Sequence, residues 1–201
     1  MSQSIKSKNF SLFIIIISAL AFVYIVAKAA MIVDKRQIST GEGIYTNCVS
    51  TSPYIMQKAE ALVEGCQSEL CEVQRVLDYV TAIPYRVNEY NAHKPAQTMI
   101  NGYGDCDDKS NLLISLLHAL NKEAYFVLVP KHIFVITPLE DERLIDTKGI
   151  WIDGKKFYVL ESTAKGSTVG FPLSYHVDQI EKMIFDPFIN KKLGYQKVVY
   201  K

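Results

Sequence analysis

The chain has 201 residues, of which 49% are hydrophobic and 21% are charged, so it can form a globular core and is not wholly disordered. Its formal net charge of +1 supplies no strong field, which argues against nucleic acid as a partner. The length fits one ordinary domain with an appendage.

The appendage is predicted at the N-terminus. Residues 10–27 contain no charged side chain and follow Lys6 and Lys8. A helix of this length just crosses a hydrocarbon core of about 30 Å. We therefore expect residues 1–33 to form a membrane anchor or signal segment, with the uncleaved anchor favoured.

The alternative is a secretory signal, because Ala27-Lys28-Ala29 fits the small-x-small cleavage pattern. The basic residues before the apolar stretch favour an N-terminus inside, although Lys35 and Arg36 on the other flank weaken that bias. We expect a single-pass protein of the cell membrane with its domain on the outer, periplasmic or extracellular, face. A cleaved signal would instead give a secreted protein.

Residues 34–52 contain Gly41 and Gly43 without a sustained period and are predicted to be a juxtamembrane linker to a domain at 53–201. Cys66 and Cys71 lie close enough in sequence for a local disulfide if the backbone turns between them. Such a bond suits an exported domain, while two unrelated small apolar residues remain the alternative.

The first half of the domain is predicted to be helical. Ser52-Pro53 has the N-cap and first-turn residues of a helix that Gly65 ends. A second helix is expected from Ser68 to Pro84, with apolar residues at helical spacing. Residues 85–104 look irregular.

A third helix is predicted from Asp105 or Cys106 to about Asn121. It is apolar on nearly all sides, so we expect it in the centre of the domain.

The second half is predicted to form an antiparallel sheet. Short apolar runs rich in β-branched and aromatic residues, bounded by turns, are typical of buried strands. The expected strands are 124–129, 133–136, 149–152, 156–160 and 196–200, with a hairpin turn at Asp153-Gly154 and a short helix near 177–184. Helices followed by such a sheet predict an α+β fold.

Cys106 is the candidate nucleophile. Gly102 and Gly104 permit a sharp turn before it, and Asp105 can cap the helix that it begins. The positive end of a helix dipole favours the thiolate, and free N–H groups at a helix start can stabilise an oxyanion. Asp107 and Asp108 oppose a thiolate, so a cationic partner such as histidine is needed.

His132 is the candidate base because it lies after a turn at the start of a predicted central strand. His118 lies in the buried helix, about 120° around it from Cys106, and is expected to be structural or partly exposed. His93 and His176 are weaker candidates.

The third member of a triad would orient the imidazole and hold its tautomer. Glu161 closes the strand expected to neighbour the histidine strand, and Asp146, in a charged loop-like stretch, is its rival. Asp105, Asp107 and Asp108 are expected to cap the helix and fix loops. No paired cysteine or histidine spacing indicates a metal site, and no cofactor is expected.

The segment around Cys106 resembles the nucleophile region of the transglutaminase-like superfamily, of the membrane-anchored bacterial or archaeal type. The resemblance covers about residues 68–170. It is carried by the following stretches: Pro95-Ala96-Gln97-Thr98-Met99, Gly102-Tyr103-Gly104-Asp105-Cys106-Asp107-Asp108-Lys109-Ser110, the strand opening with His132, and Tyr158-Val159-Leu160-Glu161-Ser162-Thr163. Many members have aspartate where this chain has Glu161.

The resemblance implies a papain-like arrangement, with a central cysteine-bearing helix packed on an antiparallel sheet that carries the histidine and the acid. It also implies acyl transfer from a peptide or protein carboxamide, through Cys106, His132 and Glu161, to water or to an amine. The expected function is therefore a membrane-tethered thiol hydrolase or acyltransferase. The alternative is a non-catalytic, membrane-anchored binding or assembly module of the same fold.

Overall fold

The computed structural model describes residues 2–34, 37–40, 43–88, 92–180 and 184–201. The chain divides into two compact units, residues 1–37 and residues 38–201. Each unit is described here by itself.

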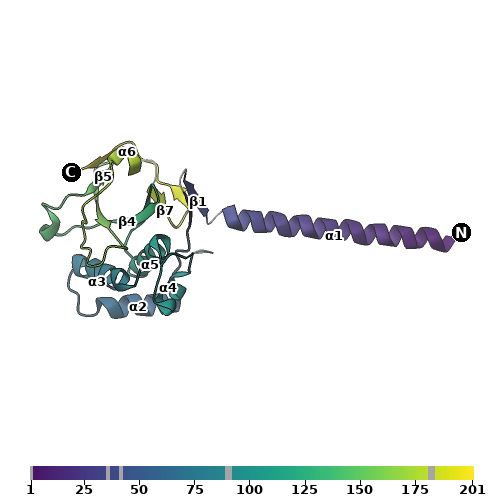
Figure 1. The fold of residues 1–201 in the computed structure, drawn as a ribbon, viewed down its shortest axis with the longest axis horizontal. Coiled ribbons are helices and arrows are strands. Elements are labelled where there is room, and N and C mark those ends of the chain that lie inside the picture. The colour runs from purple at the N-terminus through teal and green to yellow at the C-terminus, as the bar shows by residue number, and fades with distance from the viewer. Residues whose placement is uncertain (1, 35–36, 41–42, 89–91, 181–183) are drawn as a thin grey trace. The chain divides into compact units, whose positions relative to one another are not determined.

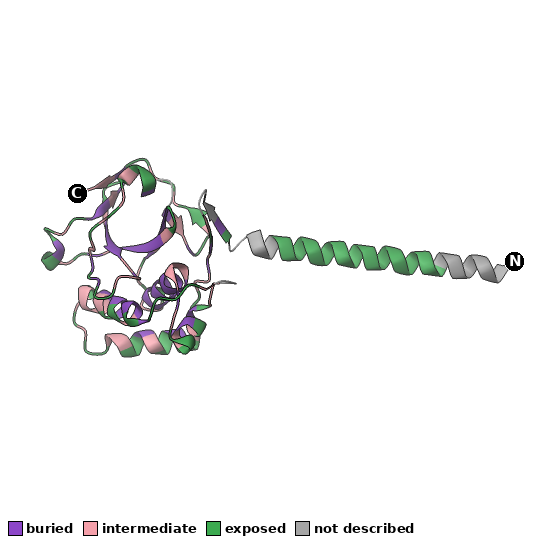
Figure 2. Ribbon diagram, in the orientation of Figure 1, coloured by how far each residue is buried: buried purple, intermediate pink, exposed green. Residues whose placement is uncertain are grey.

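The first unit is dominated by one long helix, α1 (Ser2–Asp34). Its stretch Phe10–Ala30 has a mean hydropathy of 2.7, and its described side chains are exposed along the whole helix (Figure 2). By length and composition this helix is suited to cross a membrane, either as an anchor or as a signal peptide.

The second unit places all its helices but the short last one on one side of a curled sheet (Figure 1). Its helices are α2 (Pro53–Val63), α3 (Glu69–Ala82), α4 (Pro95–Asn101), α5 (Cys106–Ala119) and the short α6 (Val177–Ile180), with a 3-10 turn at Glu142–Leu144. Helix α5 packs against α2, α3, α4 and the central strand β4, so it occupies the centre of the unit as its apolar character predicts.

The helix starts agree with the sequence prediction. The side chains of Ser52, Ser68 and Asp105 each accept a hydrogen bond from a backbone N–H in the first turn of α2, α3 and α5. Helix α4 lies within the stretch that we predicted to be irregular. It has only two turns, with Pro95 in the first and Gly102 in the left-handed conformation at its end, and is too short to show an apolar period.

The sheet has seven strands in the order β8-β7-β3-β4-β6-β5-β9, and all its neighbouring pairs are antiparallel. The strands are β3 (Tyr125–Val129), β4 (His132–Pro138), β5 (Ile150–Ile152), β6 (Lys155–Leu160), β7 (Ile184–Asp186), β8 (Lys191–Lys192) and β9 (Val198–Tyr200). The predicted α+β fold is confirmed.

The C-terminal part differs from the prediction. The helix expected near 177–184 ends at Ile180 in α6, and Ile184 instead begins β7, which pairs with β3. Residues 181–183 lie outside the described part of the chain. Strands β7 and β8 are only three and two residues long, so they carry no alternating pattern that sequence reasoning could detect.

The predicted linker at 34–52 contains two short strands, β1 (Gln37–Thr40) and β2 (Gly43–Thr46), which pair with each other. Beyond them the chain lies along α5. Asn111 accepts from the backbone N–H of Cys48 at 2.7 Å and donates to the carbonyl of Thr46 at 2.8 Å, and Ser115 accepts from Ser50. Residues 46–50 are therefore held to the central helix by its polar side chains.

Cys66 and Cys71 form a disulfide that closes the turn between α2 and α3. We expect Cys66→Ser/Cys71→Ser to lower the free energy of unfolding by about 2 kcal/mol, because the bond removes conformations from the unfolded chain. Denaturant unfolding of the two proteins measures the difference, and mass spectrometry without reduction confirms the bond. Equal stability of the oxidised and serine proteins would contradict a structural role.

Candidate active site

The pairing of two strands brings His132 and Glu161 together. Strands β4 and β6 are antiparallel, with Val135 opposite Leu160, so the beginning of β4 lies beside the end of β6. His132 is the first residue of β4 and Glu161 follows the last residue of β6. The predicted neighbouring positions of these two residues are therefore present in the structure.

His132 and Glu161 form a close hydrogen-bonded pair. Nε2 of His132 lies 2.8 Å from Oε2 of Glu161, and their side chains are 20% and 12% exposed. Burial alone would raise the pKa of Glu161, but hydrogen bonds from His132 and from Thr163 outweigh it and lower that pKa. The carboxylate is thus ionised and accepts from Nε2, which leaves Nδ1 as the ring nitrogen that can exchange a proton with a neighbour.

The start of α5 places Cys106 beside the beginning of β4, near His132. Asp105 and Asp108 cap this helix reciprocally, so the partly buried cysteine is its first residue. Its sulfur accepts a hydrogen bond from the backbone N–H of Ile133, the residue that follows His132 in β4. The thiol therefore lies against the beginning of the histidine strand.

Ser110 holds the helix to the sheet one turn after Cys106. Its hydroxyl lies 3.4 Å from the carbonyl of Ile133 and 3.2 Å from the hydroxyl of Ser162, the residue after Glu161. Both serines are fully buried. These two contacts hold α5 both to the start of the histidine strand and to the segment that carries the acid.

The thiol of Cys106 is a weak acid in this setting. Burial, together with the negative charge at Asp107 and Asp105, raises its pKa to about 12, although the backbone N–H groups of Ile133 and Asp107 act in the opposite direction. The expectation that the helix start favours a thiolate is therefore outweighed by desolvation and by the neighbouring acidic groups. At neutral pH the sulfur carries its proton, and a base must take that proton before the sulfur can attack.

Comparison with protein families gives a match between residues 56–134 and the transglutaminase-like superfamily. The matched segment includes Cys106 and ends just after His132, while Glu161 lies beyond it.

A solved structure of a putative cysteine protease from Cytophaga hutchinsonii is also similar, with a TM-score of 0.44 and 18% sequence identity. The alignment covers 57% of this chain and 40% of that chain. Comparison with curated proteins gives no significant match.

Three aspartates surround the start of α5. Burial and a hydrogen bond to Asp105 raise the pKa of Asp107 to about 8, so these two carboxyl groups share a proton at neutral pH. The backbone N–H of Asn88 donates to Asp105 at 3.0 Å, and that of Thr46 donates to Asp107 at 3.5 Å. The predicted role in capping and loop fixing is confirmed.

Asp108 has the same role, and its carboxyl group also holds His93 in place. Its carboxylate is fully buried, accepts from the backbone N–H of His93 at 2.5 Å and lies 3.2 Å from the Nδ1 atom of that residue. Oxygens of the three aspartates lie within 4.8 Å of one another, as metal ligands would. Backbone N–H groups occupy these carboxylates, so the arrangement is explained without a metal ion.

The remaining candidates lie elsewhere. His118 is exposed and rests on Phe188, with ring centroids 4.1 Å apart, and His176 is exposed before α6. Asp146 is exposed in the loop that leads to β5, at the opposite end of the sheet from His132. Of the two rival acids, Glu161 is the one that meets the imidazole.

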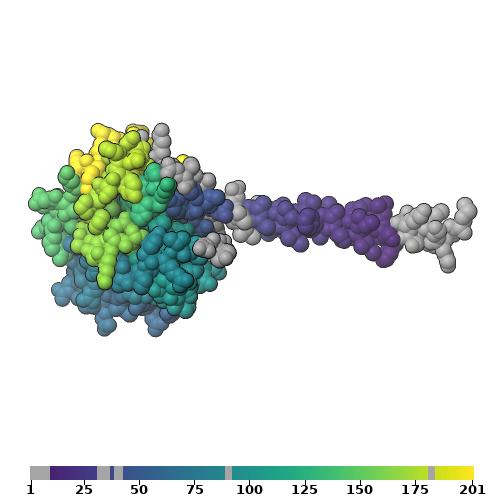
Figure 3. Space-filling model, in the orientation of Figure 1, coloured from purple at the N-terminus to yellow at the C-terminus, as the bar shows by residue number. Residues whose placement is uncertain are grey.

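Tyr175 and Tyr85 lie within electrostatic reach of Cys106, and no sequence pattern indicated either of them. The ring of Tyr175 lies nearly parallel to His132, with centroids 6.4 Å apart, and its segment lies at the surface of the second unit (Figure 3). Burial raises the pKa of Tyr175, and the charges of Glu161 and Cys106 add to this, so the phenol lies within electrostatic reach of both. Burial and Cys106 likewise raise the pKa of Tyr85, which is 55% exposed.

Lys109 is a buried cation beneath the site that the sequence analysis missed. Its side chain is almost fully buried in α5, and Nζ donates to the carbonyls of Ile83 at 2.8 Å and Thr81 at 3.5 Å, at the end of α3. Burial lowers its pKa to about 8, although the charge of Glu161 acts in the opposite direction. The sequence signal that could have identified this residue is a lysine within a helix that is apolar on nearly all sides.

We expect Lys109→Met to lower the free energy of unfolding near neutral pH by about 1–3 kcal/mol, because two buried carbonyls lose their donor. The wild type should gain stability relative to this variant between pH 8 and about pH 10.5. In that window the unfolded chain still binds the lysine proton that the folded chain has released. Denaturant unfolding across this range measures the difference, and a constant difference would contradict the buried cation.

Proposed function

We propose that the chain is a cysteine-dependent hydrolase or acyltransferase, of protease, amidase or transglutaminase type, that acts on a peptide or protein carboxamide. Cys106 would be the nucleophile, His132 the base and Glu161 the residue that orients the base. One observation carries the proposal. The His132–Glu161 pair lies beside Cys106, whose sulfur interacts with the backbone N–H of Ile133, the residue that follows His132. The family match supports cysteine-type hydrolase or transferase chemistry in general.

In the proposed reaction, Nδ1 of His132 takes the proton of the Cys106 thiol as the sulfur bonds to the substrate carbonyl carbon. Backbone N–H groups in the first turn of α5 are the candidates to stabilise the oxyanion that forms. The imidazolium then donates the proton to the leaving amine, and the carbon–nitrogen bond breaks to leave a thioester. Attack by water or by an acceptor amine releases the acyl group and restores the thiol.

Glu161 serves the base in two ways. Its hydrogen bond fixes the tautomer with the proton on Nε2, so that Nδ1 can accept the thiol proton. Its low pKa keeps it negative, which stabilises the imidazolium while that ion exists. Thr163 holds the carboxylate through its backbone N–H at 3.0 Å and its hydroxyl at 2.6 Å.

A non-catalytic binding or assembly module of the same fold is the second candidate. The observation in its favour is the raised thiol pKa of about 12, since a cysteine this weakly acidic reacts slowly without help. The hydrogen-bonded pair at His132 favours the enzyme, because a binding module has no need to orient an imidazole beside a thiol.

We further propose that α1 anchors the protein in the cell membrane, with the transglutaminase-like domain on the outer face, where it would meet peptide or protein substrates. The Cys66–Cys71 bond supports an oxidising compartment. Cleavage of α1 as a signal peptide would instead give a secreted protein. We place the anchor at 1–33 and the domain proper at 53–201, with residues 46–50 packed on its central helix.

The function is tested by trapping the acyl-enzyme. The full chain in neutral detergent is treated briefly with p-nitrophenyl acetate, quenched in acid and examined by intact and peptide mass spectrometry. We expect one acetyl group on Cys106. The amount of acetylated Cys106 should fall when the acid quench is delayed, so that water can react, or when an acceptor amine is added. Acetylation of Cys48 or lysines alone, with Cys106 unmodified, would support the non-catalytic module instead.

A further inference from the structure

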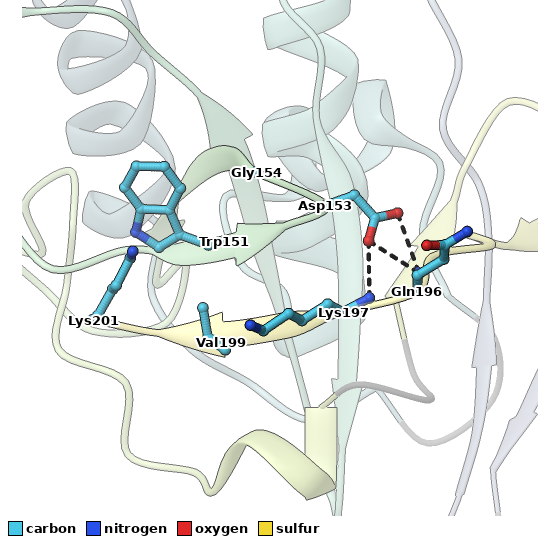
Figure 4. Close-up of a pocket in the computed structure, with 7 residues that line it drawn as sticks. All are labelled: Trp151, Asp153, Gly154, Gln196, Lys197, Val199 and Lys201. Carbon is cyan, nitrogen blue, oxygen red and sulfur yellow. Dashed lines mark hydrogen bonds between the residues drawn. The ribbon is translucent and has the colours of Figure 1, made fainter.

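A second site lies at the opposite end of the sheet from His132. Trp151 in β5 pairs with Lys156 near the start of β6, whereas Glu161 follows the end of that strand. Beside Trp151 is a hollow of about 580 Å³, whose walls come from β5, the Asp153–Gly154 turn and β9 (Figure 4). The reaction proposed above makes no use of this hollow.

The wall of this hollow combines an aromatic ring with ammonium groups. Trp151 lies opposite Val199 in the β5–β9 pair, and Lys197 and Lys201 line the same hollow. Lys197, Val199 and Lys201 occupy alternate positions in β9 and directly beside its two ends, so in this extended segment their side chains share one face of the sheet with Trp151. Nζ of Lys201 lies 4.6 Å from the centroid of the indole ring, and Nζ of Lys156 lies 5.9 Å from it.

Donors in the hollow outnumber acceptors. The indole Nε1 of Trp151 is buried and has no hydrogen-bond partner among the described residues. In Figure 4 this nitrogen and the ammonium of Lys201 lie next to each other, two donors without an acceptor between them. The carboxylate that lines the hollow, Asp153, already accepts from the backbone N–H groups of Gln196 and Lys197 at 2.8–3.2 Å.

The missing acceptor is negatively charged and extended. Neither Lys197 nor Lys201 forms an ion pair with any part of the chain that the structure describes. Their Cα atoms are four residues apart in an extended segment, which corresponds to about 13 Å. One small anion cannot bridge that separation, while two acidic side chains of an extended peptide can, and Val199 between them offers an apolar contact.

We propose that this hollow binds an acidic peptide segment, with one carboxylate between the Trp151 indole N–H and the Lys201 ammonium and a second at Lys197. The exposed Lys201 side chain moves aside from the ring to admit the first carboxylate. The proposal does not depend on the function of Cys106, since it uses none of the residues around that cysteine.

The test uses the single tryptophan of the chain as its reporter. The full chain, labelled with 15N-tryptophan and held in neutral detergent, is titrated with the peptide acetyl-Glu-Thr-Val-Thr-Glu-amide while the indole N–H resonance is recorded. We expect a saturable shift. Lys197→Gln and Lys201→Gln should each raise the dissociation constant about threefold to tenfold, as expected for the loss of one exposed charge pair.

The matched variant is Lys192→Gln, which removes an exposed lysine from the edge strand at the other side of the sheet and should leave binding unchanged. The matched peptide has glutamine in place of both glutamates and should not shift the resonance. An absent shift, an equal shift with the glutamine peptide, or an equal affinity for acetate alone would overturn the proposal. A shift with anionic lipid vesicles but not with the peptide would overturn it as well.

Discussion

Replacing Cys106 with alanine is expected to reduce acyl transfer by about 10³-fold or more, because the proposed thioester forms on its sulfur. The same change should abolish acetylation by p-nitrophenyl acetate at this position. Initial rates of p-nitrophenol release, measured with the full chain in detergent, give the size of the effect. Of the remaining cysteines, Cys66 and Cys71 are joined in the disulfide and Cys48 lies in another segment.

Cys48→Ala is the matched control for this experiment. Cys48 is also outside the disulfide and partly buried, but its sulfur lies against the carbonyl of Ala92 at 4.0 Å. We expect this variant to retain the wild-type rate. If Cys106→Ala kept the rate and Cys48→Ala lost it, the assignment of the nucleophile would be wrong.

Replacing His132 with alanine is expected to reduce the acylation rate at pH 7 by about 10²- to 10⁴-fold, the usual contribution of a positioned base. The thiol pKa of about 12 makes this effect large, because the variant can react only through the small fraction of thiolate present. Below that pKa the fraction of thiolate increases tenfold for each pH unit. The rate of His132→Ala should therefore rise steadily with pH, while the wild-type rate depends less on pH.

His118→Ala controls for the loss of an imidazole elsewhere on the cysteine helix, since His118 is exposed and contacts Phe188. We expect wild-type rates from it. Glu161→Gln should lie between the wild type and His132→Ala, because it keeps the shape of the acid but not its charge. Parallel pH profiles for the wild type and His132→Ala would show that another group activates Cys106.

Local sequence signals predicted much of this structure. The caps Ser52, Ser68 and Asp105 act through hydrogen bonds within one helical turn, so their residue types alone identify the helix starts. The meeting of His132 with Glu161 was also expected, because the histidine begins one predicted strand and the acid follows the end of the strand expected beside it. Strands β4 and β6 do pair, although β5 lies between them in the chain.

Properties that depend on packing were not predictable. The sign of the Cys106 pKa shift reflects how deeply the start of α5 is buried and how closely Asp105 and Asp107 approach it, neither of which a sequence pattern specifies. Tyr175 reaches His132 from a segment without a period. The sequence analysis assigned no role to Lys109, and only the position of the end of α3 shows that two carbonyls accept hydrogen bonds from its ammonium group.

These packing effects bear on how such a site would work. The thiolate is the reactive form of a cysteine, so a neutral thiol beside the hydrogen-bonded Glu161–His132 pair reacts only after it gives up its proton. Reaction then requires that the imidazole take the proton as the electrophile approaches.

Competitive alkylation of two cysteines in one molecule tests most directly whether His132 activates Cys106. The folded chain is treated at neutral pH with a limiting amount of iodoacetamide, and the modified peptides are counted by mass spectrometry. We predict that Cys106 reacts about tenfold faster than Cys48 and that His132→Ala removes this advantage. A Cys106 that is inert, or that reacts equally well in His132→Ala, would contradict the proposed activation.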